Sequence, residues 1–182
     1  MTVVIITGVP GVGKSTVIDA AQKAKGYKVV VYGTEMFNVA KMRGLVKDRD
    51  EMRKLDPILQ REIQESAAHS IAMMGDVIVD THCTIKTPRG FLPGIPAWVA
   101  QALKPKQIIL VEAPPHDIVR RRNNDPSRAR DPDSEDDIAG HQNINRAAAM
   151  TIATLTGATV ATVTNAEGMV DQTRDHVVRI LG

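Results

Sequence analysis

The sequence predicts an α/β fold, a three-layer sandwich in which a sheet of five parallel strands lies between two layers of helices. Short runs rich in β-branched residues alternate along the chain with longer runs of helical periodicity, as in βαβ units. Several of the short runs are continuously apolar, which is typical of strands covered on both faces. The length of 182 residues suits one domain with a full core, so we expect a single domain over residues 1–182.

Five segments are predicted as strands. The first is apolar over nearly its whole length, and the third ends on the carboxylate of Asp80. Right-handed crossovers bring the carboxyl ends of parallel strands to one edge of the sheet, and ligands bind beyond that edge. The predicted strands are residues 2–7, 28–32, 76–80, 107–111 and 159–164.

Eight segments are predicted as helices. One stops at Gly26, and another opens with Asp56 as its N-cap and Pro57 in its first position. The predicted helices are residues 15–25, 35–43, 48–55, 57–74, 97–103, 116–123, 138–155 and 168–181. Because three of them fall between the second and third strands, residues 34–75 are predicted to form a helical insertion that serves as a substrate lobe.

Two segments are predicted to lack regular structure. Residues 81–96 are dense in Thr, Pro and Gly, and a loop of that length inside a compact domain is usually functional or disordered. Residues 124–137 are charged, poor in apolar residues and interrupted by Pro126 and Pro132. We expect this second segment to be exposed and mobile and to act as a short lid.

The composition is that of a soluble globular protein, with 43% hydrophobic and 24% charged residues. Aromatic residues at 3% and a net charge of +2 argue against a nucleic-acid-binding protein. The single cysteine, Cys83, excludes an internal disulfide and favours a reduced, cytoplasmic protein. The apolar run at residues 2–7 is too short for a signal or a membrane anchor, so no membrane partner is expected.

The clearest motif is the stretch Gly8-Val9-Pro10-Gly11-Val12-Gly13-Lys14-Ser15, which lies between a predicted strand and a predicted helix. A glycine, four residues and then Gly-Lys-Ser form the P-loop pattern of nucleotide-binding proteins. Backbone N–H groups of such a loop wrap a polyphosphate, the lysine reaches the terminal phosphates, and the helix that follows directs its positive end at the same anion. We therefore expect a P-loop NTPase sandwich that binds ATP through residues 8–16, namely Gly8, Val9, Pro10, Gly11, Val12, Gly13, Lys14, Ser15 and Thr16.

A metal site is predicted beside this loop. The Ser15 hydroxyl is placed to bind Mg²⁺, and Asp80 ends a strand in the position where P-loop enzymes keep an acidic residue that holds the metal directly or through water. The alternative is that Asp80 only caps the loop that follows its strand.

Basic residues form two further groups. One comprises Arg49, Arg53 and Lys54 in the insertion, and the other comprises Arg120, Arg121, Arg122, Arg128 and Arg130. Arginine suits bidentate phosphate contacts, and phosphoryl transfer depends on positive charge around the transferred group. Together with Lys14, Arg128 and Arg130 are the candidate catalytic residues, on a lid that closes over ATP. The alternative is solvated surface, which is the usual place for charge runs.

The sequence resembles the archaeal-type adenylate kinases, a group of P-loop nucleoside monophosphate kinases. The resemblance covers almost the whole chain and rests on residues 6–16, 48–57, 79–96, 120–131 and 145–160. It implies reversible transfer of the terminal phosphate of ATP to AMP, giving two ADP, with Mg²⁺ as cofactor. Family members are similar in forming trimers, so the resemblance also implies a homotrimer.

The resemblance assigns AMP to the insertion around Thr34 and Arg53, with His82 and Lys86 as further candidates. His82 is expected either to contact the substrate or to pack behind the P-loop. Other adenylate kinases carry Asp-Gly-Phe-Pro-Arg after the third strand, whereas this chain has Asp80-Thr81-His82-Cys83-Thr84. The arginine of that motif has no aligned equivalent, and its role is open between Lys86 and Arg89.

Two alternative functions are consistent with the P-loop. One is a kinase for another nucleoside monophosphate or a small acceptor such as a sugar acid. The other, from a different class, is an ATP-dependent binding or regulatory protein that uses the P-loop as a switch.

Overall fold

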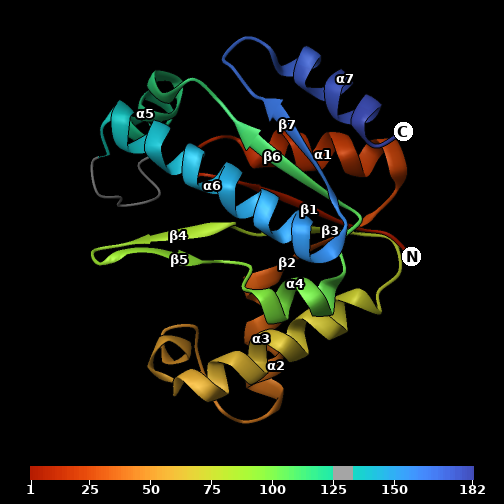
Figure 1. Cartoon of the computed structure of the whole chain (residues 1–182), viewed down its shortest axis with the longest axis vertical. Helices are drawn as coiled ribbons and strands as arrows, with labels where there is room; N and C mark the ends of the chain where they lie inside the picture. Colours follow the sequence, from red (N-terminus) through yellow and green to blue (C-terminus); the bar gives the residue numbers. More distant parts are fainter. Residues whose placement is uncertain (125–132) are drawn as a thin grey trace.

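A computed structural model describes residues 1–124 and 133–182 of the chain. Its central sheet has five strands in the order β2-β3-β1-β6-β7, and all neighbouring strands are parallel (Figure 1). The strands are β1 Val3–Gly8, β2 Lys28–Val31, β3 Val77–Asp80, β6 Gln107–Glu112 and β7 Thr159–Thr164. The predicted parallel sheet is therefore confirmed.

The central strands β1, β3 and β6 are buried on both faces of the sheet, to which successive side chains point in turn. In β1, Ile5 belongs to one hydrophobic cluster and Ile6 to the other, and neither side chain is exposed. The first cluster packs against α3 Pro57–Ala72, α4 Ala97–Leu103 and α6 Glu135–Thr156. The second packs against α1 Lys14–Lys25, α5 Pro115–Asn123 and α7 Val170–Ile180. Within the described residues, none of the helices has the length and hydropathy that a membrane span requires.

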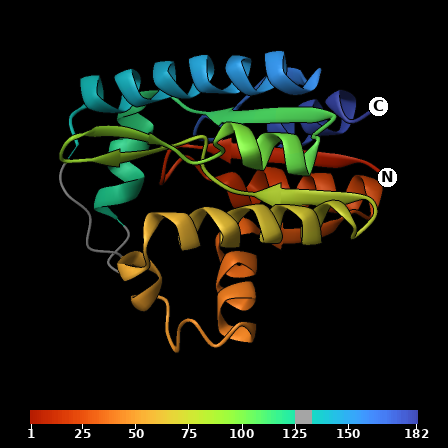
Figure 2. The same ribbon diagram turned by 60° about the horizontal axis from the view of Figure 1, so that its bottom comes forward.

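The long crossover between β2 and β3 is helical. Helix α2 Tyr32–Met42 follows β2 directly and packs against α3, and Figure 2 shows α2 projecting below α3, away from the sheet. The helix predicted for residues 48–55 is wrong, because only one 3₁₀ turn, η1 Glu51–Lys54, forms there. The carboxylate of Asp48 accepts hydrogen bonds from the amides of Asp50 and Glu51, and such side-chain bonds replace the helical pattern.

The loop predicted for residues 81–96 is also wrong. It contains an antiparallel hairpin of β4 Thr84–Thr87 and β5 Gly90–Pro93. The Thr87 hydroxyl donates to the Gly90 carbonyl and accepts from the Arg89 amide, which closes the turn. In Figure 1 the hairpin extends between α6 and the insertion formed by α2, η1 and α3.

Helix α6 begins at Glu135, earlier than the predicted start at Ile138. A capping box fixes this start: the Ser134 hydroxyl accepts from the Asp137 amide, and the Asp137 carboxylate accepts from the Ser134 amide. The first turn of the helix therefore takes up the last residues of the segment 124–137. Within that segment, residues 125–132 lie outside the part of the chain that the structure describes.

Candidate active site

The P-loop connects the end of β1 to the start of α1. Gly13 is the N-cap of α1 in a left-handed conformation, with φ of 86°, and no side chain caps the helix. The N–H groups of the first turn of α1 are thus left for an anion, and the helix dipole favours negative charge at the same place. The loop has the geometry that binds a polyphosphate.

Glycine is required at two positions of this loop. A Cβ at Gly8 would lie 2.5 Å from the carbonyl oxygen of Val111 in the neighbouring strand β6. A Cβ at Gly13 would lie 2.3 Å from Nδ2 of Asn165, and the positive φ of Gly13 adds backbone strain for any other residue. At Gly8 and Gly13 the loop backbone therefore lies too close to its neighbours for any side chain.

Arginine and asparagine side chains hold the carbonyl groups of the loop. Arg122 Nε donates to the Pro10 oxygen at 2.8 Å, and Arg121 Nη1 donates to the Val12 oxygen at 3.0 Å. Asn165 Nδ2 donates to the Val12 oxygen at 3.0 Å. These bonds give the carbonyl oxygens of Pro10 and Val12 donors from outside the loop, and they hold the loop backbone in place.

Lys14 contacts the predicted metal residue. Its Nζ donates to Asp80 Oδ1 at 2.6 Å and to the Thr81 carbonyl oxygen at 2.9 Å. Asp80 is the last residue of β3, and β3 pairs with β1, which leads into the P-loop. The sheet therefore brings the P-loop and Asp80 together at its carboxyl edge, as the sequence predicted. Ser15, which follows Lys14 in the first turn of α1, is exposed.

His82 lies against the P-loop. Its Nδ1 is 3.2 Å from the Gly8 carbonyl oxygen, and because a carbonyl only accepts, Nδ1 carries the proton. Burial lowers the pKa of His82, and the positive charge of Lys14 lowers it further. His82 is therefore a neutral side chain that supports the start of the loop.

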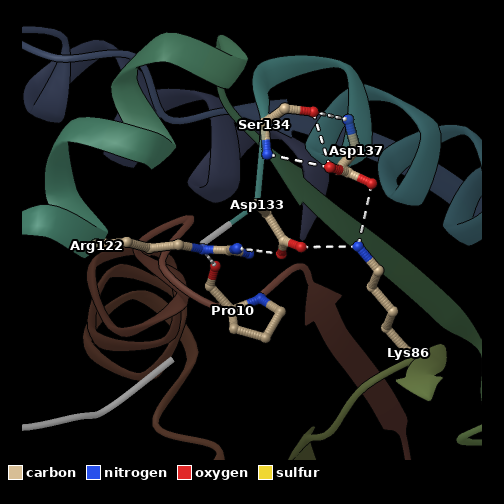
Figure 3. Close-up of polar contacts among 6 residues, drawn as sticks. All are labelled: Pro10, Lys86, Arg122, Asp133, Ser134 and Asp137. Carbon is tan, nitrogen blue, oxygen red and sulfur yellow. Dashed lines mark hydrogen bonds and ion pairs between the residues drawn. The ribbon is translucent and has the colours of Figure 1, made fainter. Parts of the chain in front are cut away.

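Lys86, on β4, takes part in an ion-pair network with the start of α6. Its Nζ lies 2.7 Å from Asp133 Oδ1 and 3.2 Å from Asp137 Oδ1, and Asp133 Oδ2 accepts from Arg122 Nη1 at 2.6 Å (Figure 3). Burial alone would raise the pKa of Asp133, but hydrogen bonds from Lys86 and Arg122 outweigh it and hold the pKa below the ordinary value. The network joins the hairpin to the P-loop through Arg122.

A cavity of about 560 Å³ lies between the insertion and the hairpin. Its basic residues are Arg49 and Arg53, its amides are Gln60 and Gln64, and the hairpin contributes apolar side chains, including Ile85 and Leu92. Arg49 Nη2 donates to the Thr34 hydroxyl at 2.7 Å. The cavity thus combines apolar walls with guanidinium groups, which suits a ligand that has a flat apolar part and an anionic part.

The predicted acceptor-site residues lie in three different places. Arg53 lines the cavity, and Thr34 binds the cavity residue Arg49. His82 lies behind the P-loop, and Lys86 is paired with the start of α6. Arg128 and Arg130, the predicted lid residues, lie outside the described residues. The structure therefore groups Arg53 and Thr34, and it separates them from His82 and Lys86.

Comparison with known proteins places the chain in a family. A family model described as an AAA domain matches residues 7–139, which include the P-loop. The chain is 51% identical to an adenylate kinase of Thermoplasma acidophilum, over 97% of each chain. It is 48% identical to an adenylate kinase of Methanocaldococcus jannaschii, over 98% of this chain and 97% of that one. The chain belongs to the adenylate kinase family.

Solved structures with lower sequence identity share the fold of this adenylate kinase family member. A shikimate kinase from Acinetobacter baumannii superposes with a TM-score of 0.62 at 14% identity, covering 100% of this chain and 93% of that one. A shikimate kinase from Bacteroides thetaiotaomicron gives a TM-score of 0.59 at 12% identity, covering 99% and 98%. At such identities the likeness concerns the three-layer fold alone.

Several residues of the adenylate kinase site were missed from the sequence. Asn165 follows β7 and holds the P-loop, although it is more than 150 residues away along the chain. Arg121 and Arg122 were grouped with the basic segment that follows them, and their binding to loop carbonyls was not foreseen. Gln60 and Gln64 line the cavity one helical turn apart. Because α3 also carries polar side chains at Arg61, Glu62, Glu65 and Ser66, the spacing of the two glutamines gives no distinctive signal in the sequence.

Proposed function

We propose that this protein catalyses the reversible transfer of the terminal phosphate of ATP to AMP, giving two ADP. The observation that carries this proposal is that the chain is 46–51% identical to archaeal adenylate kinases over nearly its full length. The P-loop and the separate cavity lined by Arg49 and Arg53 support the proposal, because a transfer between two nucleotides needs two binding sites.

ATP is assigned to the P-loop. Its β- and γ-phosphates would accept hydrogen bonds from the loop amides and from the Lys14 ammonium group, with residues 8–16 supplying the contacts. The Lys14 ammonium group has three N–H donors, and one of them donates to Asp80. When ATP binds, its phosphates would accept hydrogen bonds from this group as well.

Mg²⁺ is assigned to Ser15 and Asp80. Within the described residues, no cluster of three or more His, Cys, Asp or Glu side chains is able to hold a metal ion alone. One hydroxyl and one carboxylate nevertheless suit Mg²⁺, which is usually bound through one or two carboxylates together with substrate phosphates and water. When bound, the ion would neutralise charge on the phosphate oxygens between which transfer occurs.

AMP is assigned to the cavity between the insertion and the hairpin, with its phosphate on Arg53. Its phosphate oxygen is already a nucleophile, so the protein needs no general base. Catalysis would come from aligning the two nucleotides and from positive charge around the transferred group, to which Lys14 contributes. Residues 34–75 are the proposed AMP lobe, and Thr34 would support it through Arg49.

Three further assignments rest on the resemblance. Arg128 and Arg130, in the proposed lid at residues 124–137, would add positive charge over the phosphates. The resemblance assigns His82 and Lys86 to AMP as well; His82 would act only through the P-loop that it supports, and Lys86 only through the hairpin that lines the acceptor cavity. We also propose a cytoplasmic homotrimer, for which light scattering should give three times the 19.8 kDa mass of the chain.

The test is an assay of ADP formation from ATP with AMP, CMP, UMP, GMP or shikimate as acceptor, each with Mg²⁺. The proposal predicts rapid ADP formation with AMP and much slower reaction with the others. A strong preference for another acceptor would show that AMP is not the substrate that accepts the phosphate. ATP binding without transfer to any acceptor would indicate a binding or regulatory protein instead.

A further inference from the structure

The acceptor cavity contains two side-chain amides whose orientation is set by their neighbours. Gln60 and Gln64 lie one turn apart on α3, so their side chains share one face of the helix. Both line the cavity, together with apolar side chains such as Met36, Ile63 and Ile85. In an apolar cavity, a few placed polar groups usually set which ligand is accepted.

Trp98 fixes the Gln64 amide. The Trp98 Nε1–H donates to Gln64 Oε1 at 2.9 Å, and an indole N–H is only a donor, so its partner must be the amide oxygen. The amide NH₂ of Gln64 is thereby left as the group that can donate to a ligand. Two further contacts hold Trp98 and Gln64 in place. The Arg61 Cζ lies 4.7 Å from the centroid of the Trp98 ring, and the Tyr32 hydroxyl donates to the Gln64 backbone oxygen at 2.9 Å.

The backbone of Leu55 fixes the Gln60 amide in the opposite sense. Gln60 Nε2 donates to the Leu55 carbonyl oxygen at 2.7 Å, and a carbonyl oxygen is only an acceptor. The Gln60 Oε1 is therefore left as an acceptor for a ligand. One turn of α3 thus offers the cavity an acceptor from Gln60 and a donor from Gln64, and neither amide can flip without losing its bond.

We propose that Gln60 and Gln64 select the base of the acceptor nucleotide, with Trp98 as a positioning residue. Adenine carries an amino group next to a ring nitrogen, that is, a donor beside an acceptor. The amino group would donate to Gln60 Oε1, and the ring nitrogen would accept from Gln64 Nε2. Hypoxanthine and guanine carry a carbonyl oxygen in place of the amino group, so that oxygen would face Gln60 Oε1 without a hydrogen bond, which is costly in a closed site. This inference rests on the proposed function and deepens its acceptor site.

The experiment compares AMP with IMP, which differ at both positions that the two glutamines would contact. In hypoxanthine a carbonyl oxygen replaces the amino group, and an N–H donor replaces the ring nitrogen that accepts. We would measure kcat/KM for both with ATP as donor, and Kd by calorimetry where turnover is too slow, in wild type, Gln60→Met, Gln64→Met and Trp98→Phe. Each glutamine variant should lose about tenfold or more in kcat/KM for AMP and much less for IMP. Gln101→Met makes the same change at an exposed position of α4 and should alter neither value.

Trp98→Phe keeps an aromatic ring for packing and removes the N–H donor. The ratio of kcat/KM for AMP to kcat/KM for IMP should fall, and KM for AMP should rise while KM for ATP stays unchanged. A merely structural role for Trp98 would lower kcat/KM for AMP and for IMP by the same factor. The inference would be overturned if all three variants kept the wild-type ratio of kcat/KM for AMP to kcat/KM for IMP, that is, if any loss were equal for the two nucleotides. Failure of wild type to form ADP from ATP and AMP would instead reject the proposed function, so the two failures are distinguishable.

Discussion

The ammonium nitrogen of Lys14 lies 2.6 Å from Oδ1 of Asp80, so the residue assigned to the phosphates and the residue assigned to the metal form an ion pair. Both side chains are mostly buried, with 14% and 25% of their surfaces exposed. The pairing arises because β1 and β3 are neighbours and both end at the same edge of the sheet. It places positive and negative charge where an ATP–metal complex requires both.

Lys14→Met should lower kcat by about 100-fold or more, because it removes a donor directed at the charge that develops during transfer. A steady-state assay with ATP and AMP measures this. Lys23→Met changes an exposed lysine in the last turn of the same helix and should leave kcat unchanged. A Lys14→Met rate close to wild type would remove Lys14 from the catalytic role.

Asp80→Asn should have opposite effects with and without metal. Loss of the carboxylate frees Lys14 for phosphate, so ATP should bind at least as tightly in EDTA, whereas the Mg²⁺-dependent kcat should fall about tenfold or more. Calorimetry of ATP binding and a Mg²⁺ titration of the rate measure the two effects. An unchanged Mg²⁺ dependence would mean that Asp80 only caps its loop.

Arg53→Met should raise KM for AMP by about 10- to 100-fold, since a hydrogen bond to a charged group contributes about 1.5–3 kcal/mol. KM for ATP should stay within about twofold of the wild-type value, because Arg53 lines the acceptor cavity and is not part of the P-loop. Lys54→Met alters the adjacent exposed charge, which is not among the cavity residues, and serves as the control. Equal changes in both KM values would contradict the assignment of Arg53 to AMP.

Gly13→Ala should destabilise the fold by about 1–3 kcal/mol and weaken ATP binding, since its Cβ would meet Asn165 at 2.3 Å with φ of 86°. Gly26→Ala, at the other end of α1, also has a positive φ but nothing within 4 Å of its Cβ. It should cost stability without affecting ATP binding. Thermal unfolding and ATP titration of both variants separate the clash from the backbone strain.

Asp137 should make stability depend on acid pH. Hydrogen bonds from Ser134, together with Lys86, lower the pKa of Asp137 from 3.8 to about 2. A lowered carboxyl pKa means that its stabilisation is fully present above pH about 5 and is lost as the pH falls towards about 2. Asp137→Asn should therefore lower the urea midpoint at pH 7 and have little effect near pH 2. Asp136→Asn, at the adjacent exposed carboxylate, is the control.

Local patterns were enough to predict the sheet and the P-loop. The β-branched runs and the Gly-x₄-Gly-Lys-Ser spacing are local signals. They predicted all five strands and the position of the P-loop and Asp80 at the same edge of the sheet, but not the contact of Lys14 with Asp80. The missed features depend on side-chain bonds or on distant partners. Asp48 breaks a helix by binding nearby amides, and Asn165 reaches the P-loop from the end of β7.

The acceptor cavity illustrates the same limit. Arg53 was assigned to AMP by the family resemblance, whereas Gln60 and Gln64 belong to no motif of the sequence. The orientation of the Gln60 amide depends on a local bond to the Leu55 carbonyl oxygen. The orientation of the Gln64 amide depends on Trp98, and that contact exists only once α3 and α4 have packed. The hairpin that closes the cavity was predicted as a loop because its Thr and Gly content outweighed its short alternating strands.

The proposed transfer is reversible, so incubation with ADP and Mg²⁺ alone tests it without any second substrate. Nucleotide chromatography should show ATP and AMP appearing in equal amounts, with no inorganic phosphate released, and Lys14→Met should suppress both products together. ADP that stays unchanged, or AMP that appears with inorganic phosphate and without ATP, would contradict phosphate transfer between two nucleotides.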